Sequence, residues 1–101
     1  MHPDIEALAQ KLREAEKLLR AHHESRWADW LASDADRIHS LDFYGIEHLL
    51  SAFGGMGSLN DVVLQYQDRA VLHVPPTENE RFDVLREEIY LLARKLKSEE
   101  T

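Results

Sequence analysis

The fold is decided most clearly by residues 77–96, which read TENERFDVLREEIYLLARKL. Five apolar residues recur there at alternating steps of three and four, which places them on one face of a helix: Phe82, Leu85, Ile89, Leu92 and Leu96. Thr77 and Glu80 have the spacing of a capping box, in which Thr77 caps the helix and Glu80 reaches back to it. Basic residues follow in the last turns, where the helix dipole favours cations. This stretch therefore predicts an amphipathic helix.

The N-terminal stretch has the same pattern and predicts a helix from about Pro3 to His22. Proline suits the first helical position, because its missing N–H would have no partner there. The apolar stripe of this helix also has five members: Ile5, Leu8, Leu12, Ala15 and Leu19. Exposure of either apolar stripe to water is unfavourable, so we expect the two helices to pack on each other or on the helices between them.

Two helices are predicted between the terminal ones. The first covers residues 25–40, with Trp30 at the edge of an inner face that consists of Trp27, Leu31, Ala35 and Ile38. The second is shorter and covers residues 43–52. Gly54 and Gly55 are expected to stop it, because glycine readily adopts the left-handed conformation that a helix end needs.

The segment after the glycines has the least regular pattern. Ser58 or Asn60 is expected to cap a short helix from Asn60 to about Tyr66, and an extended segment follows. The prolines at 75–76 then break the chain. Residues in this segment favour β-structure, but no second strand is apparent with which they would pair.

These elements predict an all-α, bundle-like fold of four main helices plus a short helix. A chain of 101 residues is enough for one modest core, so we expect a single helical domain over residues 1–101.

Composition excludes several classes of protein. The chain has no cysteine, which excludes a disulfide framework and thiolate–metal sites. Acidic residues near the N-terminus stand where a signal peptide would have a basic region. No apolar run approaches the roughly 20 residues that span a bilayer. We therefore expect a cytoplasmic protein with no membrane association.

The net charge of −7 comes from 19 acidic and 12 basic residues. Such a surface repels nucleic acids and anionic membranes, and it attracts a basic protein. The alternative is that the charge only keeps a small protein in solution.

Residues 54–58, Gly-Gly-Met-Gly-Ser, form the most unusual local motif. Backbone N–H groups in such a loop can cradle a phosphate. A P-loop, however, needs a lysine before Ser58, and Asn60 stands where a dinucleotide motif has its last glycine. A tight turn between helices is the favoured interpretation, with Met56 at its tip as a partner contact or, in preference, a core residue.

Histidines suggest a metal site, but their spacing does not support one. The His-x-x-x-His and His-Glu-x-x-His patterns do not occur among the dispersed residues His22, His23, His39, His48 and His73. We therefore expect neither a native metal site nor a cofactor.

Acidic residues cluster between positions 29 and 47: Asp29, Asp34, Asp36, Asp42 and Glu47. Asp34 lies beside the apolar stripe of its helix, where burial would raise its pKa and suit it to general acid catalysis. The favoured alternative is that this carboxylate accepts a hydrogen bond from a tryptophan indole or acts as a backbone cap.

Residues 49–64, read LLSAFGGMGSLNDVVL, carry a resemblance to a known family. The chain resembles small bacterial proteins of unknown function with a Gly-Gly-Met-Gly-Ser-Leu-Asn-Asp core, a preceding Trp-rich helix and a following Leu-Arg-x-x-Ile-Tyr-x-Leu-Ala helix. The resemblance covers roughly residues 27–96 and implies no activity. Many small acidic bacterial proteins of this kind neutralise a toxin, which is an analogy only.

We therefore expect a protein-binding module rather than an enzyme, most concretely an immunity-type inhibitor that occludes a basic toxin domain at fixed stoichiometry. The residues expected to contact the partner are Asp29, Asp36, Asp42, Tyr44, Glu47 and Met56. One alternative is a small enzyme or ligand-binding protein that uses the 54–58 loop with Asp34, His48 or Asn60. Another is a homo-oligomer formed through a surplus apolar stripe on the first or last helix.

Overall fold

The computed structural model describes residues 2–54, 57–64 and 77–100. These residues form, in chain order, α1 (Pro3–Ala21), α2 (Ser25–His39), α3 (Tyr44–Leu50), the 3-10 turn η1 (Leu59–Asp61) and α4 (Glu78–Glu100). No strand occurs in the described ranges, so the all-α prediction is confirmed there.

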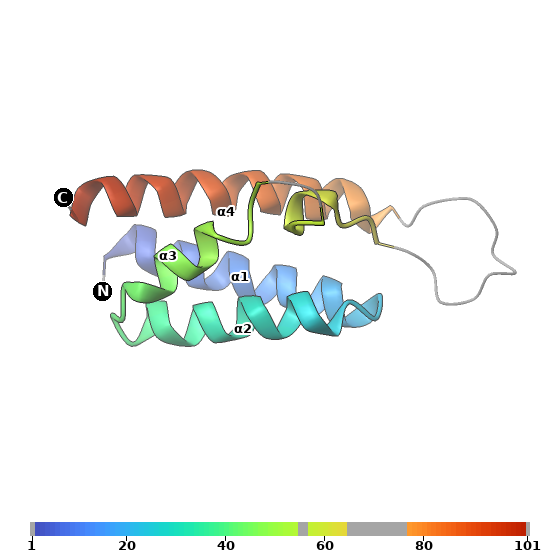
Figure 1. The fold of residues 1–101 in the computed structure, drawn as a ribbon, viewed down its shortest axis with the longest axis horizontal. Helices are drawn as coiled ribbons and strands as arrows, with labels where there is room; N and C mark the ends of the chain where they lie inside the picture. The colour runs from blue at the N-terminus through green and yellow to red at the C-terminus, as the bar shows by residue number, and fades with distance from the viewer. Residues whose placement is uncertain (1, 55–56, 65–76, 101) are drawn as a thin grey trace, which may run out of the picture.

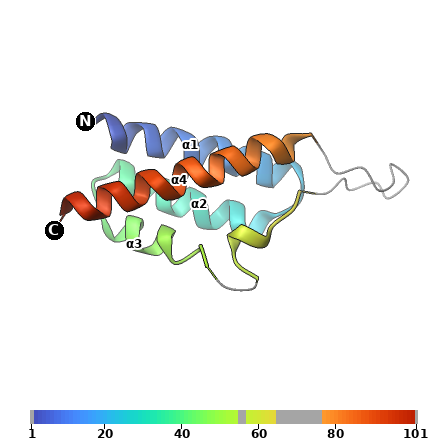
Figure 2. The same ribbon diagram turned by 90° about the horizontal axis from the view of Figure 1, so that it is seen from above.

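The three long helices lie side by side along one axis (Figure 1). α1 runs antiparallel to α2 and α4 and contacts both. The short α3 contacts α2 and α4, and the view from above shows it beside both on one side of the bundle (Figure 2). α1 begins and α4 ends at the same end of the bundle, which is also where α2 turns into α3.

The predicted apolar stripes form the core. All five stripe residues of α1 are buried, as are the inner-face residues of α2, with Trp30 half-buried at the edge. On α4 the stripe is buried except at Leu92, which is partly exposed. The two terminal stripes therefore pack as expected. None of the described helices is both long and apolar enough to cross a bilayer.

α1 and α2 end in the same motif, with residues that are unusual for it. The N–H of Asp42 donates to the carbonyl of Arg37 (2.7 Å) and that of Leu41 to Ile38 (3.0 Å), which is a Schellman pattern. Its left-handed position, where glycine is usual, holds Leu41 with φ 63°. α1 ends in the same way, with His23 at φ 64°.

α3 is shorter than predicted, because it ends at Leu50 with Ser51 as its C-cap. The glycines are therefore not its cap. Gly54 has a φ of 99° and turns the loop three residues later. Gly55 lies outside the described residues.

The short helix predicted from Asn60 is wrong beyond its first turn. η1 ends at Asp61, and Val62 has extended backbone. The carbonyls of Leu59, Asn60 and Val62 all accept hydrogen bonds from Arg86 of α4, at 2.8–3.0 Å. These contacts hold the end of η1 and the extended residue after it against α4. Ser58 is the cap, since its Oγ accepts from the N–H of Asn60.

Further along the same segment, the backbone of Leu64 is hydrogen-bonded to a side chain of α4, which the sequence did not indicate. The Asn79 side chain accepts from the N–H of Leu64 (2.8 Å) and donates to its carbonyl (3.0 Å). The end of the helix predicted to Tyr66, the extended segment after it and the prolines at 75–76 lie outside the described residues.

The capping box predicted for α4 is also wrong. The N–H of Glu80 donates to the carbonyl of Thr77 (3.1 Å), and the Thr77 hydroxyl pairs with the Glu78 carboxylate (3.4 Å). The backbone carbonyl thus takes the hydrogen bond that the box assigns to the hydroxyl.

Candidate functional site

A buried carboxylate of α2 is paired with a histidine of α3. Asp34 is 0% exposed, and its Oδ1 lies 2.5 Å from Nδ1 of His48. The helices come this close because Gly45 has no side chain. A Cβ at Gly45 would lie 2.9 Å from the Cβ of Arg37 and 3.3 Å from the carbonyl oxygen of Asp34. The glycine therefore lets α3 bring His48 onto Asp34.

Burial raises the pKa of Asp34 to about 6, because the charged carboxylate loses its hydration, while the hydrogen bond to His48 acts in the opposite direction. The raised pKa predicted from the sequence is therefore confirmed. The favoured alternative, a hydrogen bond to a tryptophan indole or backbone cap, is wrong. Oδ2 of Asp34 and the indole N–H of Trp30 are both buried without a hydrogen-bond partner among the described residues.

Aromatic rings lie around the histidine. The imidazole of His48 stacks on Trp30, with ring centroids 4.2 Å apart and planes 16° apart. Tyr44 stacks on the same imidazole at 6.5 Å, and the guanidinium of Arg37 lies 5.2 Å from the Tyr44 ring centroid. The side chain of His48 remains 32% exposed. The imidazole is therefore fixed in orientation and still reachable from solvent.

The turn between α2 and α3 exposes two large apolar side chains beside this pair. Leu41 is 57% and Tyr44 59% exposed. Asp42 accepts a hydrogen bond from the backbone N–H of Tyr44 (3.2 Å), which ties the carboxylate to the start of α3. Glu47 is exposed and makes no ion pair among the described residues. We call Leu41, Asp42, Tyr44 and Glu47 the α2–α3 corner.

Three of the six residues predicted to contact a partner belong to this corner: Asp42, Tyr44 and Glu47. Two others lie elsewhere on α2, at its boundary with α1, where Asp29 pairs with Arg20 at 3.0 Å and Asp36 pairs with Arg13. These two carboxylates are therefore neutralised within the chain. Met56 lies outside the described residues. Leu41, which the sequence analysis missed, has no local signal, because leucine is rare in the left-handed conformation.

One N–H group of the glycine loop that a phosphate would need is already hydrogen-bonded within the chain. The N–H of Gly57 donates to the Asp61 carboxylate at 2.7 Å. A carboxylate in that position also repels an incoming anion. The phosphate interpretation of the 54–58 loop therefore gains no support from its described residues.

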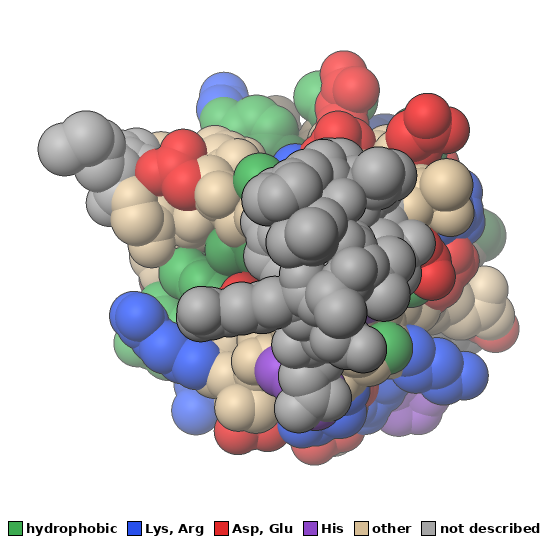
Figure 3. Space-filling view, turned by 90° about the vertical axis from the view of Figure 1, so that its right-hand side faces the viewer, with side chains coloured by type: hydrophobic (Ala, Val, Ile, Leu, Met, Phe, Trp, Pro, Cys, Tyr) green, Lys and Arg blue, Asp and Glu red, His purple; other side chains and the backbone are tan. Residues whose placement is uncertain are grey.

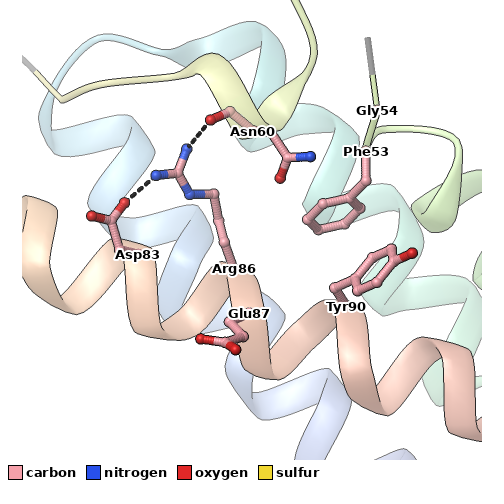
Figure 4. A pocket seen from close by; sticks show the side chains of 7 residues that line it. All are labelled: Phe53, Gly54, Asn60, Asp83, Arg86, Glu87 and Tyr90. Carbon is pink, nitrogen blue, oxygen red and sulfur yellow. Dashed lines mark hydrogen bonds and ion pairs between the residues drawn. The ribbon is translucent and has the colours of Figure 1, made fainter.

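A pocket of about 470 Å³ lies between the end of the α3 segment, η1 and α4 (Figure 4). It is lined by Phe53, Gly54, Asn60, Asp83, Arg86, Glu87 and Tyr90. A second hollow, of about 510 Å³, shares Phe53 and Tyr90 with it and continues along α4 to Arg94 and Lys97. Of the residues named for a ligand site from the sequence, Gly54 and Asn60 line the first pocket, whereas Asp34 and His48 do not. The described lining residues come from three separate segments, so no local motif identifies the whole set.

One group of potential metal ligands occurs among the described residues: His2, Asp4 and Glu99. Nδ1 of His2 already accepts from the N–H of Asp4 (3.0 Å), and the Asp4 carboxylate pairs with Lys95 (2.7 Å). These contacts link the start of α1 to the end of α4. The group is therefore explained by its structural role in holding the two helices together.

Charge is not segregated at the opposite end of the bundle. Around the residues drawn in grey, Figure 3 shows acidic and basic side chains interspersed. That face gives a basic partner no uniform acidic surface.

Comparison with known proteins yields one family. A family described as "Domain of unknown function (DUF6966)" matches residues 20–72, which are 53 of the 101 residues. The matched region includes the α2–α3 corner, the Asp34–His48 pair and the glycine-rich core. Neither the curated proteins nor the solved structures include a match to the chain.

Proposed function

The chain belongs to the DUF6966 family, and we propose that it is a protein-binding module that docks on a basic partner through the α2–α3 corner. The most concrete form of this function is immunity-type inhibition, in which the corner enters and occludes the active-site cleft of a toxin domain. The inhibitor then acts at fixed stoichiometry.

The conformation of Leu41 carries the proposal. A non-glycine residue in the left-handed region costs about 1–2 kcal/mol, and glycine at the same position would avoid that cost. The left-handed turn closes the end of α2, but glycine would make the same turn without the strain, and the Leu41 side chain is 57% exposed. A strained, exposed leucine beside an exposed tyrosine is typical of a contact surface, where strain is retained for function.

The chemistry of the corner fits a basic partner. Tyr44 supplies a large, rigid anchor of the kind that dominates interface energies. Asp42 and Glu47 lie beside it as rim carboxylates, which speed the encounter with a positive surface. The overall charge of −7 adds long-range attraction.

A second candidate function rests on the Asp34–His48 pair. An imidazole oriented by a buried carboxylate and open to solvent is an arrangement used for general base catalysis. If the chain is an enzyme, His48→Gln abolishes turnover of its substrate. Glu47→Gln, which alters a neighbouring exposed side chain of α3, leaves that turnover unchanged.

The test of the binding function begins by identifying the partner. The wild-type chain and a Leu41→Gly/Tyr44→Ala variant are immobilised and exposed to a lysate of the organism that encodes the protein. The partner is a protein retained by the wild type and lost with the variant. Leu91→Ala serves as the matched control, because Leu91 is 58% exposed on α4, outside the corner.

Titration with that purified partner then decides the mechanism. We expect saturation at a fixed stoichiometry, slower association as salt rises, and inhibition of the partner's own activity. Inhibition at sub-stoichiometric amounts, with a modified partner as the product, would contradict occlusion and favour the enzyme. Equal retention of the partner by the wild type and both variants would exclude the corner as the contact surface.

A further inference from the structure

The pocket beside α4, which we call the α4 pocket, has the size of a small-ligand site. Its volume of about 470 Å³ lies within the range of roughly 300–1,000 Å³ that such sites occupy. None of its seven lining residues belongs to the α2–α3 corner. The chemistry of the α4 pocket is therefore independent of the function proposed above.

Two aromatic rings form one wall of the α4 pocket. Phe53 and Tyr90 pack with ring centroids 5.2 Å apart and planes inclined by 58° (Figure 4). The Tyr90 hydroxyl accepts a hydrogen bond from Arg94 at 2.8 Å, which fixes the ring. Aromatic faces carry negative electrostatic potential and attract cations. The guanidinium of Arg94 already lies 5.6 Å from the centroid of the Tyr90 ring, so Phe53 offers the ring that has no cation over it among the described residues.

The arginine in the α4 pocket is already engaged. Nη1 of Arg86 donates to the carbonyls of Leu59, Asn60 and Val62, and its Nη2 pairs with the Asp83 carboxylate. These contacts attach η1 to α4, so the pocket exists before any ligand arrives. They engage three of the five N–H groups of Arg86, which leaves it fewer donors with which to hold an anion.

One carboxylate in the α4 pocket is not engaged. Glu87 is exposed, lies three residues before Tyr90 on α4, and makes no ion pair among the described residues. Among the described lining residues, Asp83 and Glu87 against Arg86 leave a net charge of −1. A carboxylate and two aromatic rings thus share one hollow (Figure 4).

We propose that the α4 pocket binds a small organic cation, namely a guanidinium or primary ammonium group on a short apolar stem. The stem lies against Phe53 and Tyr90, and the charged group pairs with Glu87. An anion is disfavoured, because it would meet the carboxylates of Asp83 and Glu87. The cation is either a free small molecule or the arginine or lysine side chain of a polypeptide.

The test uses n-butylguanidinium for the free molecule and the capped tripeptide Gly-Arg-Gly for the polypeptide. n-Butylurea is the matched neutral control, because it keeps the shape and loses the charge, and pentanoate tests for an anion site. Binding is followed by the backbone amide NMR shifts of residues that line the pocket. We expect saturable shifts with both cations at millimolar concentration and none with the urea.

Glu87→Gln should weaken cation binding at least fivefold, and Tyr90→Leu should weaken it further in a variant whose circular dichroism is unchanged. Glu80→Gln, which removes an exposed carboxylate of α4 outside the pocket, should leave binding unchanged.

Saturation by the tripeptide alone assigns the site to a polypeptide side chain, and saturation by butylguanidinium alone assigns it to a free cation. Equal binding of the urea, saturation by pentanoate, full affinity in Glu87→Gln, or no saturation by either cation would overturn the proposal. None of these results bears on the binding function proposed for the α2–α3 corner.

Discussion

Replacing Asp34 by asparagine should remove a pH dependence of stability that the buried carboxylate creates. Burial raises the pKa of Asp34 from 3.8 to about 6, so the native state binds its proton more tightly than the unfolded state does. Protonation therefore stabilises the fold. This contribution is fully present below pH 3.8 and is lost as the pH rises through 6.

The size of the effect follows from the two pKa values. The full difference of about 2 pKa units corresponds to about 3 kcal/mol. Between pH 7.5 and 5.5 only part of the titration takes place, and the linkage relation gives a gain of about 1 kcal/mol. His48, through its hydrogen bond and charge, and Arg37, through its charge, oppose the shift, so the pair with His48 titrates as a unit.

Urea denaturation of the wild type, Asp34→Asn and Asp29→Asn at both pH values measures this contribution. Asp29→Asn is the matched control, because it removes a carboxylate that is 72% exposed on the same helix. The wild type and the control should gain stability on acidification, whereas Asp34→Asn should gain about 1 kcal/mol less. His48→Gln, alone and with Asp34→Asn, completes a double-mutant cycle that isolates the coupling of the pair.

If Asp34→Asn keeps the full pH dependence of the wild type, the buried carboxylate is not its source. A titrating carboxylate elsewhere would then be responsible, and Asp34 would have to be solvated in the native protein. If Asp29→Asn also loses the gain in stability on acidification, the effect is not specific to Asp34.

Four further predictions test the packing and the corner. Gly45→Ala should destabilise the fold by about 1–3 kcal/mol in urea denaturation, because its Cβ meets Arg37 at 2.9 Å and α3 has to move; an unchanged midpoint would contradict the close approach. Gly54→Val should cost about 1–2 kcal/mol through its positive φ alone, since nothing lies within 4 Å of the added Cβ; valine tolerated without loss would mean that the turn is misassigned. Leu41→Gly should raise stability by about 1 kcal/mol while weakening partner binding, and a loss of stability would show that leucine serves the fold. Glu47→Lys should slow association with the partner and flatten its salt dependence at unchanged stability, whereas an effect on dissociation alone would place Glu47 inside the contact.

The helices were predictable because each is determined by its own residues. Period-3.6 stripes on α1 and α4 and the inner face of α2 require only local sequence, and their burial follows from the need to remove them from water. The end of the short helix was not predictable, because this segment is held by hydrogen bonds from Arg86, more than twenty residues later. The capping box failed for a local reason: the N–H of Glu80 donates to the backbone carbonyl of Thr77 and not to its hydroxyl.

The candidate site divides in the same way. A raised pKa at Asp34 could be inferred from its place beside an apolar stripe, but its partner could not, because His48 reaches it only through the glycine contact between α2 and α3. Asp29 and Asp36 looked like free acids in the sequence and are paired with arginines of α1. Spacing along one helix carries no information on which neighbour neutralises a charge.

Two destabilising features meet at the α2–α3 junction, and their coincidence is the strongest reason to place function there. Leu41 holds a conformation that glycine would adopt without strain. A few residues away along α2, Asp34 is a buried carboxylate with one oxygen unpaired among the described residues, where an apolar side chain would avoid the loss of hydration. Local rules broken together in one small region, while the stripes around them obey every rule of helix packing, are typical of a site retained for binding or catalysis rather than for stability. The variants Leu41→Gly and Asp34→Asn should therefore share one signature: at pH 7.5 each should leave the fold as stable as the wild type or more so, and each should reduce the affinity for the partner, measured by titration. Loss of stability without loss of affinity in both variants would show that the junction is built for the fold.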